Sequence, residues 1–118
     1  MPASKFDLSV YRVVSRIPRG RVATYAVVAR ALRCGSARAI GQALRRNPFA
    51  PEVPCHRVIS SSLSLGGFQG HRQGAAIDAK RALLKNEGVG FDSSGRLLDS
   101  GCVLTVEELG LEAMRGAV

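Results

Sequence analysis

Apolar residues recur three or four positions apart through residues 6–17, which is the spacing of one face of an α-helix. The residues that carry this spacing are Phe6, Val10, Val13, Val14 and Ile17. Pro18 and Gly20 follow at once, and both residue types disfavour continuation of a helix. The pattern therefore predicts a first helix that buries one face and ends before Pro18.

Two further helices are expected after a short break. Thr24 is a good N-cap for a helix over residues 25–33, and Ser36 is a good N-cap for a helix over residues 37–46. Cys34-Gly35 makes a tight break between them. A helix, a short glycine-containing turn and a second helix are typical of a DNA-binding helix-turn-helix.

The helix over residues 37–46 has two sides of opposite character when its residues are placed 100° apart. One side consists of Ala39, Ile40, Ala43 and Leu44, and the other of Arg38, Gly41, Gln42, Arg45 and Arg46. The second side would suit contact with DNA, and Gly41 would allow a close approach. An amphipathic helix with a solvated charged face is the alternative. The preceding helix and turn favour DNA recognition.

The second half of the chain predicts shorter elements. Pro51 and Pro54 prevent a regular helix over residues 50–59, so a turn that enters an extended segment is expected there. A long loop over residues 60–75 and a fourth helix over residues 76–86 should follow.

The last part of the chain predicts a small hairpin and a helix. Residues 89–98 should fold back around Ser94-Gly95, and Thr105 with Glu108 forms the capping box of a final helix. The expected fold is mainly α: a single winged helix-turn-helix-like domain over residues 1–118, with a short C-terminal hairpin and a terminal helix.

Charge strengthens the DNA hypothesis. The chain carries a formal net charge of +8, and residues 1–59 contain eleven Lys and Arg but only two acidic residues. A basic half of this kind favours a polyanionic partner such as nucleic acid. No apolar run is long enough to span a bilayer, and the N-terminus lacks the pattern of a signal peptide. We therefore expect an intracellular monomer with no membrane partner.

The three cysteines, Cys34, Cys55 and Cys102, are widely spaced and form no CxxC motif. Neither a disulfide framework nor a metal site is expected. Cys55 is followed by His56, and a thiol becomes a strong nucleophile once a nearby imidazole accepts its proton, directly or through a water. Glu87 is the candidate carboxylate to orient that imidazole. The alternative is a small buried cysteine beside a histidine that forms hydrogen bonds in the core.

The order of these features resembles the 6-O-alkylguanine-DNA alkyltransferase family. The segments that carry the resemblance are RGRVATYAVVA (19–29), SARAIGQALRRNP (36–48), PCHRVI (54–59), GGFQG (66–70) and KRALLKNEG (80–88). They span most of residues 6–90. The resemblance implies DNA repair in which the protein binds duplex DNA containing 6-O-alkylguanine, flips out the damaged base and acts once, without metal or organic cofactor.

The resemblance also implies roles for individual residues. Cys55 would accept the alkyl group, with His56 acting as a base through a water and Glu87 orienting it. Asn47 would hold the active-site turn, and Tyr25 would press on a DNA phosphate and protonate the leaving guanine. Arg38 would fill the vacated space in the base stack. The remaining DNA-binding residues would be Gly41, Gln42, Arg45 and Arg46, and the substrate pocket would include Pro54, Val58, Phe68 and Gly70.

Three departures from the family pattern keep alternatives open. The sequence begins almost at the first helix, so we expect the N-terminal domain of larger members to be absent; Phe68 stands where a tyrosine is common, and residues 70–79 should form a longer loop. Short chains with such a loop also resemble alkyltransferase-like proteins, which bind alkylated DNA and recruit nucleotide excision repair proteins but usually lack the cysteine. A plain transcription factor would leave Cys55 and Glu87 without a role, and a cysteine hydrolase finds no support here.

Overall fold

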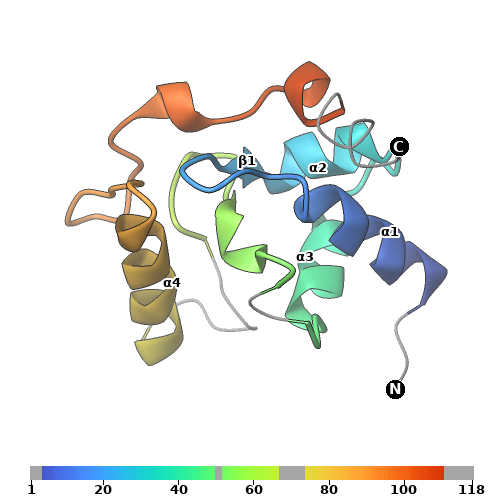
Figure 1. Cartoon of the computed structure of the whole chain (residues 1–118), viewed down its shortest axis with the longest axis horizontal. Coiled ribbons are helices and arrows are strands. Elements are labelled where there is room, and N and C mark those ends of the chain that lie inside the picture. The colour runs from blue at the N-terminus through green and yellow to red at the C-terminus, as the bar shows by residue number, and fades with distance from the viewer. Residues whose placement is uncertain (1–3, 50–51, 67–73, 111–118) are drawn as a thin grey trace.

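The computed structural model describes residues 4–49, 52–66 and 74–110 of the chain. Three helices, α1 (Lys5–Val14), α2 (Tyr25–Ala31) and α3 (Ala37–Arg45), pack together, and α4 (Ala75–Asn86) stands on the other side of the central strands (Figure 1). The strands β1 (Ala23–Thr24) and β2 (Val58–Ile59) lie between the two parts, and Cys55–Arg57 forms a 3-10 turn just before β2. A second 3-10 turn spans Ser100–Cys102, and residues 106–110 are helical. The fold is mainly α, as the sequence predicts.

Helix α1 ends earlier than its apolar spacing suggests. Its last helical residue is Val14, and the amides of Arg16 and Ile17 bond to the carbonyls of Val13 and Val14 three residues back. Pro18 explains the change, because a proline disfavours the α conformation in the residue before it. Ile17 is still buried, so the prediction of the buried face is confirmed although the helix is shorter.

In the helix-turn-helix, α2 and α3 each begin at the N-cap residue that the sequence predicts. The Thr24 hydroxyl accepts a hydrogen bond from the Val27 amide at 3.1 Å, and the Ser36 hydroxyl accepts one from the Ala39 amide at 3.1 Å. Helix α2 ends at Ala31 instead of Arg33, because Arg33 adopts a left-handed φ of 56°, which terminates a helix. The caps are local contacts, which is why the sequence could place both helix starts.

A parallel pairing of β1 with β2 was not foreseen. Ala23 pairs with Val58 and Thr24 with Ile59, across more than thirty residues of chain. Val22, the residue before β1, pairs with a different segment: its amide donates to Cys102 O, and its carbonyl accepts from the Leu104 amide. The pairing fixes the 3-10 turn that precedes β2 relative to α2, which follows β1.

Residues 89–98 fold back as predicted, in a form shorter than a regular hairpin. Phe91 and Leu97 form an antiparallel bridge, and Gly95 turns the chain with a φ of 87°. The Asp92 carboxylate accepts from the amides of Ser94 and Arg96. The capping box of the last helix is also present, because Thr105 and Glu108 bond to each other's amides.

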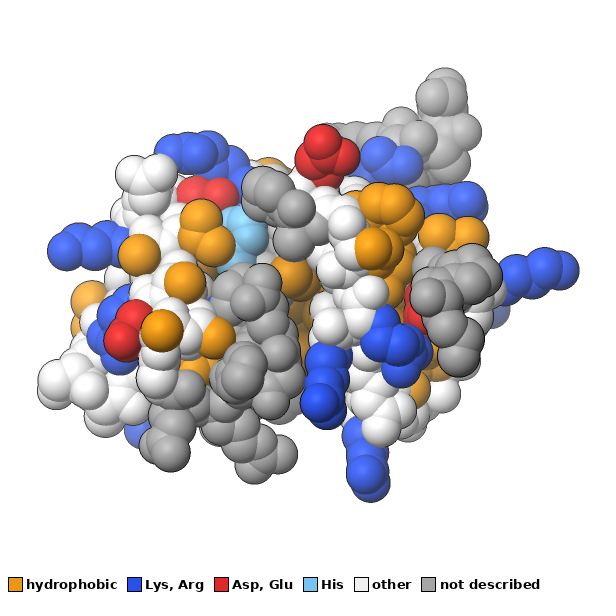
Figure 2. Space-filling model, turned by 90° about the horizontal axis from the view of Figure 1, so that it is seen from below, with side chains coloured by type: hydrophobic (Ala, Val, Ile, Leu, Met, Phe, Trp, Pro, Cys, Tyr) orange, Lys and Arg blue, Asp and Glu red, His pale blue; other side chains and the backbone are white. Residues whose placement is uncertain are grey.

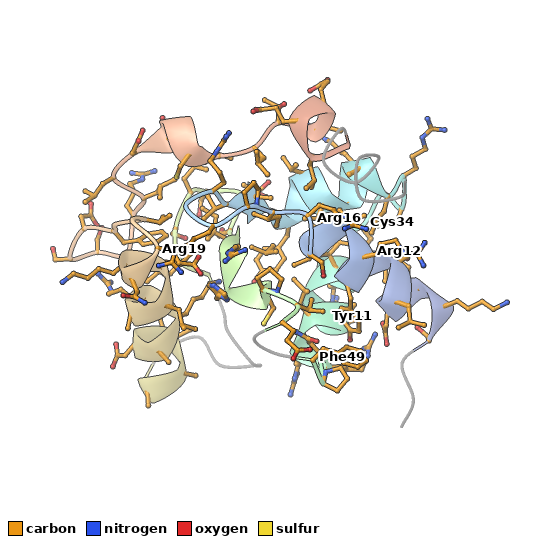
Figure 3. The ribbon with its side chains drawn as sticks, in the orientation of Figure 1. Tyr11, Arg12, Arg16, Arg19, Cys34 and Phe49 are labelled. Atoms are coloured by element: carbon orange, nitrogen blue, oxygen red, sulfur yellow. The ribbon has the colours of Figure 1, made fainter. Side chains whose placement is uncertain are left out.

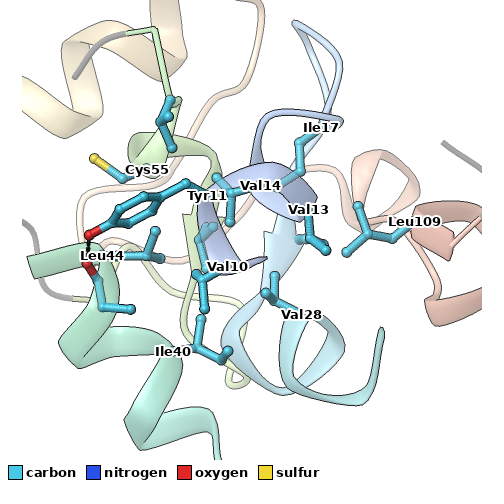
Figure 4. Packing of buried hydrophobic residues seen from close by; sticks show 14 of the residues in the cluster. Val10, Tyr11, Val13, Val14, Ile17, Val28, Ile40, Leu44, Cys55 and Leu109 are labelled. Atoms are coloured by element: carbon cyan, nitrogen blue, oxygen red, sulfur yellow. Dashed lines mark hydrogen bonds between the residues drawn. The ribbon is translucent and has the colours of Figure 1, made fainter. Parts of the chain in front are cut away.

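The hydrophobic core consists of two clusters. The larger one lies between α1, α2 and α3 and contains Val10, Val14, Val28 and Ile40, all fully buried, with Cys55 at its edge (Figure 4). The smaller one joins α4 to β2 and the turns around it, through residues Val22, Ile59, Leu65, Leu84 and Val89. Full burial of one such side chain contributes about 1.5–3 kcal/mol. The two clusters therefore hold the turn at Cys55–Arg57 between them.

Candidate active site

Cys55 begins the 3-10 turn at the boundary of the larger cluster. Its side chain is 8% exposed, and Asn47 holds the preceding backbone. The Asn47 side-chain amide donates to Val53 O at 3.1 Å, and its oxygen accepts from the Phe49 amide at 2.9 Å. Asn47 therefore bonds at two points to the loop between α3 and Cys55, and its role in holding the active-site turn stays a prediction.

The backbone before Cys55 is irregular, as Pro54 suggested. Pro54 has φ −81° and ψ 67°, and the Arg57 amide bonds back to the Pro54 carbonyl at 2.9 Å. A 3-10 turn places neighbouring side chains about 120° apart, whereas a strand would place them on opposite faces. The turn therefore removes the geometric obstacle to cooperation between Cys55 and His56.

His56 and Glu87 form the pair that the sequence predicted. The imidazole Nε2 lies 3.1 Å from Glu87 Oε2, and the two side chains are 5% and 9% exposed. Glu87 is the C-cap of α4, so the end of that helix delivers the carboxylate to the turn. The carboxylate can orient the imidazole and stabilise its protonated form.

Arg57 holds the same carboxylate from the other side, a contact that sequence reasoning missed. Its Nε donates to Glu87 Oε1 at 2.9 Å and its Nη2 to Oε2 at 2.8 Å, while Nη1 donates to Ile17 O at 2.8 Å. The forked bond to Arg57, together with that to His56, lowers the pKa of Glu87 to about 2. Glu87 therefore stays ionised throughout the neutral range.

The Cys55 thiol needs a base. Burial raises the pKa of Cys55, and a hydrogen bond from Asn47 and the charge of Lys80 oppose this effect only in part. The resting group is therefore the thiol, which is a weak nucleophile. His56 is the next residue in the 3-10 turn, and its imidazole is the candidate to accept that proton.

Tyr25 is half-buried at the start of α2, between two glycines. A Cβ added at Gly41 would lie 4.0 Å from one edge of its ring, and one added at Gly66 would lie 3.6 Å from the other edge and 3.3 Å from the Ser60 amide. Burial and the nearby Cys55 raise the pKa of Tyr25 to about 12. The hydroxyl therefore keeps its proton and remains a donor near Cys55.

Lys80 is the second residue that sequence reasoning missed. It is fully buried on α4, and its ammonium donates to Val58 O at 2.8 Å and to Leu65 O. Its Nζ also lies 6.0 Å from the centroid of the Tyr25 ring. Burial lowers the pKa of Lys80 to about 7. The available signal was a lysine in line with the apolar residues of the fourth helix.

The outer side of α3 is exposed and basic, as predicted. Arg38, Gln42 and Arg45 are exposed, and Gly41 is half-buried. Several Lys and Arg side chains project from the right half of the face in Figure 2. Arg46 differs from the others, because its guanidinium forms an ion pair with the buried Asp7 of α1 at 2.7 Å. A DNA contact by Arg46 would have to compete with this pair.

Two of the four predicted pocket residues lie within the part of the chain that the structure describes. Pro54 and Val58 are buried, and the Val58 amide bonds to Cys55 O while its carbonyl accepts from Lys80. The contact expected between the Val58 main chain and a guanine stays a prediction. Phe68 and Gly70 lie outside the described residues. No group of three or more potential metal ligands occurs within residues 4–49, 52–66 and 74–110, and no helix there is long and apolar enough to cross a membrane.

Comparison with known proteins identifies the same region. Residues 5–89 match the family model of the 6-O-methylguanine DNA methyltransferase DNA-binding domain. A methylated-DNA–protein-cysteine methyltransferase of Methanothermobacter thermautotrophicus is 44% identical over 89 residues, which cover 75% of this chain and 47% of that protein. The chain spans about half the length of the curated relatives it matches, 47% and 51% in two of them.

Two solved structures with DNA are also similar. Mycobacterium tuberculosis OGT in complex with DNA is 39% identical with a TM-score of 0.65, over 73% of this chain and 51% of that chain. Schizosaccharomyces pombe Atl1, in complex with damaged DNA containing O6-carboxymethylguanine, is 31% identical with a TM-score of 0.66, over 82% of this chain and 90% of that chain.

Proposed function

Because the chain belongs to the 6-O-methylguanine-DNA methyltransferase family, we propose that it repairs duplex DNA by moving an alkyl group from the 6-oxygen of guanine onto Cys55. One observation carries this proposal: the buried Cys55 thiol begins a turn whose next residue, His56, is bonded to the ionised Glu87. A transcription factor would have no use for this arrangement.

The reaction is a displacement at carbon. His56 accepts the Cys55 proton through a water, the sulfur forms a bond to the alkyl carbon, and the bond from that carbon to the guanine oxygen breaks. The Tyr25 hydroxyl gives a proton to the leaving guanine and regains one when the proton that His56 accepted is returned, so the thiol proton ends on guanine and Tyr25 is again a neutral hydroxyl. Because the thioether product resists hydrolysis, each molecule acts once.

Access to the alkyl carbon requires the base to leave the stack, which costs a few kcal/mol. The exposed side of α3 would lie in a DNA groove with Arg38 in the space that the base leaves. Contacts from Arg45 and Gln42 to the backbone would add affinity that does not depend on sequence. The protein would work as a monomer in the compartment that holds the DNA, the cytoplasm or the nucleus.

The second candidate is a damage sensor that holds an alkylated guanine without transfer and recruits nucleotide excision repair proteins. The observation that favours it is the structural similarity to S. pombe Atl1, which was solved with damaged DNA containing O6-carboxymethylguanine. Cys55 favours transfer, because a sensor has no need of a nucleophile.

The test is an intact mass measurement after incubation with a duplex that contains 6-O-methylguanine. Transfer adds one methylene unit to the protein, and Cys55→Ala abolishes the gain. Cys34→Ala and Cys102→Ala are matched controls that should retain it. Tight binding to the damaged duplex with unchanged mass would reject transfer in favour of the sensor, and loss of the gain in either control would refute the assignment of Cys55.

A further inference from the structure

Arg57 is the one residue of the Cys55-His56-Arg57 turn that the proposed reaction leaves without a role. It is held at three points: both oxygens of Glu87 and the carbonyl of Ile17 accept from its guanidinium. Its side chain is 17% exposed, so solvent screens these contacts little. A guanidinium so fixed acts on the carboxylate as a permanent charge, because it does not lose its proton near neutral pH.

Glu87 Oε2 serves two partners. It lies 2.8 Å from Arg57 Nη2 and 3.1 Å from His56 Nε2. A buried carboxylate alone would favour the protonated imidazole, since an opposite charge within about 4–6 Å favours the charged form of a group. A protonated imidazole cannot accept the proton of a thiol. If Arg57 did not share the charge of Glu87, the carboxylate would orient His56 but would also favour the protonated imidazole, which cannot act as a base.

We propose that Arg57 is a positioning residue that shares the charge of Glu87, so that Glu87 orients His56 without drawing a proton onto it and leaves the imidazole able to accept the Cys55 proton. For the transfer reaction this inference rests on the proposed function. The protonation of His56 itself does not.

Two other charged side chains lie near the His56–Glu87–Arg57 cluster, those of Arg19 and Lys80, and they make different contacts. The Arg19 guanidinium donates to the Asn86 carbonyl at 3.0 Å, at the C-terminal end of α4 (Figure 3), and has no bond to the Glu87 carboxylate. Lys80, also on α4, donates to Val58 O and Leu65 O and influences Cys55. Arg19 therefore offers a matched control: an arginine bonded to the same helix end without the carboxylate contact.

The experiment follows the titration of the His56 ring by NMR. The sequence contains two histidines, so His71→Gln leaves His56 as the only signal. Arg57→Gln should raise the pH of the titration midpoint by about 1 unit or more, because a neighbouring charge typically shifts a pKa by 1–3 units. Arg57→Lys should give a smaller rise, because it keeps the charge but loses the fork. Arg19→Gln should leave the midpoint within a few tenths of a unit.

A second arm links the titration to repair. The acid limb of the methyl-transfer rate should move to higher pH by the same amount in Arg57→Gln. In a protein that already carries Glu87→Gln, the further change Arg57→Gln should raise the midpoint by less than it does in the wild type, because only the direct repulsion between the guanidinium and the imidazolium is then removed.

Two outcomes would overturn the proposal. One is an unchanged or lower midpoint in a folded Arg57→Gln or Arg57→Lys protein, and the other is an equal rise in Arg19→Gln. If no methyl transfer occurs at all, the proposed function fails while the titration still decides the role of Arg57.

Discussion

Replacement of Lys80 by methionine should reveal the cost of a buried lysine in this fold. Lys80 is fully buried, yet its Nζ donates to two carbonyls, Val58 O and Leu65 O. A neutral amine keeps two N–H groups, so both bonds survive when Lys80 loses its proton. Methionine has similar length and removes both the charge and the donors, which leaves two buried carbonyls without this partner.

The magnitude follows from the pKa of Lys80, which burial lowers from 10.5 to about 7. Between these values the unfolded chain binds a proton at Lys80 that the folded chain does not bind, so the stability of the folded state rises with pH. Each pH unit within this window adds at most about 1.4 kcal/mol to the free energy of unfolding. Between pH 7 and 9 the wild-type protein should therefore gain about 2 kcal/mol relative to Lys80→Met.

The assay is urea unfolding of both proteins at pH 6, 7, 8 and 9, with the difference in unfolding free energy plotted against pH. Both proteins should also carry Cys55→Ala, because the charge of Lys80 affects the pKa of Cys55; the difference then reports on Lys80. It should be nearly flat below pH 7, where Lys80 is charged in both states, and should grow in favour of the wild type above it. A difference that is constant over the whole range would refute the lowered pKa of Lys80.

Two further predictions concern the DNA-binding face and the wall of the site. Arg38→Ala should weaken binding to a duplex with 6-O-methylguanine by about 1–3 kcal/mol in a titration at fixed salt, whereas Lys5→Ala, an exposed change on α1, should cost far less; equal losses would argue against base flipping at Arg38. Gly66→Ala should lower the unfolding free energy by about 1 kcal/mol or more, because Gly66 has a φ of +68° and the new Cβ would lie 3.3 Å from the Ser60 amide. Denaturant unfolding checks this value, and an unchanged midpoint would show that the loop shifts freely.

Helix starts were predictable because their signals are local. Thr24 and Ser36 bond to amides three residues ahead, and Thr105 with Glu108 forms its capping box over the same distance. Helix ends were placed less well. The apolar spacing continues to Ile17 and Leu32, but Pro18 and the left-handed Arg33 stop the helices earlier.

The His56–Glu87 pair was predictable for a different reason. The two residues are 31 positions apart, and only the order of motifs along the chain suggested that they meet. The same order said nothing about Arg57, because an arginine after a histidine can bond to any carboxylate or to water. Arg46 shows what the sequence could not supply: its place on the basic side of α3 suggests DNA, which stays a prediction, and the packed structure adds a long-range ion pair with Asp7 of α1.

Neighbours within one or two turns of helix were enough to settle where α2 and α3 begin, which side of α3 is basic, and that a thiol and an imidazole stand next to each other. Three other properties had to wait for the packed molecule: the protonated state of the thiol, the sharing of Glu87 between His56 and Arg57, and the burial of Lys80 beside Tyr25. Each of these depends on desolvation and on charges from distant segments, and such effects exist only once β1, β2 and α4 have packed around the turn at Cys55.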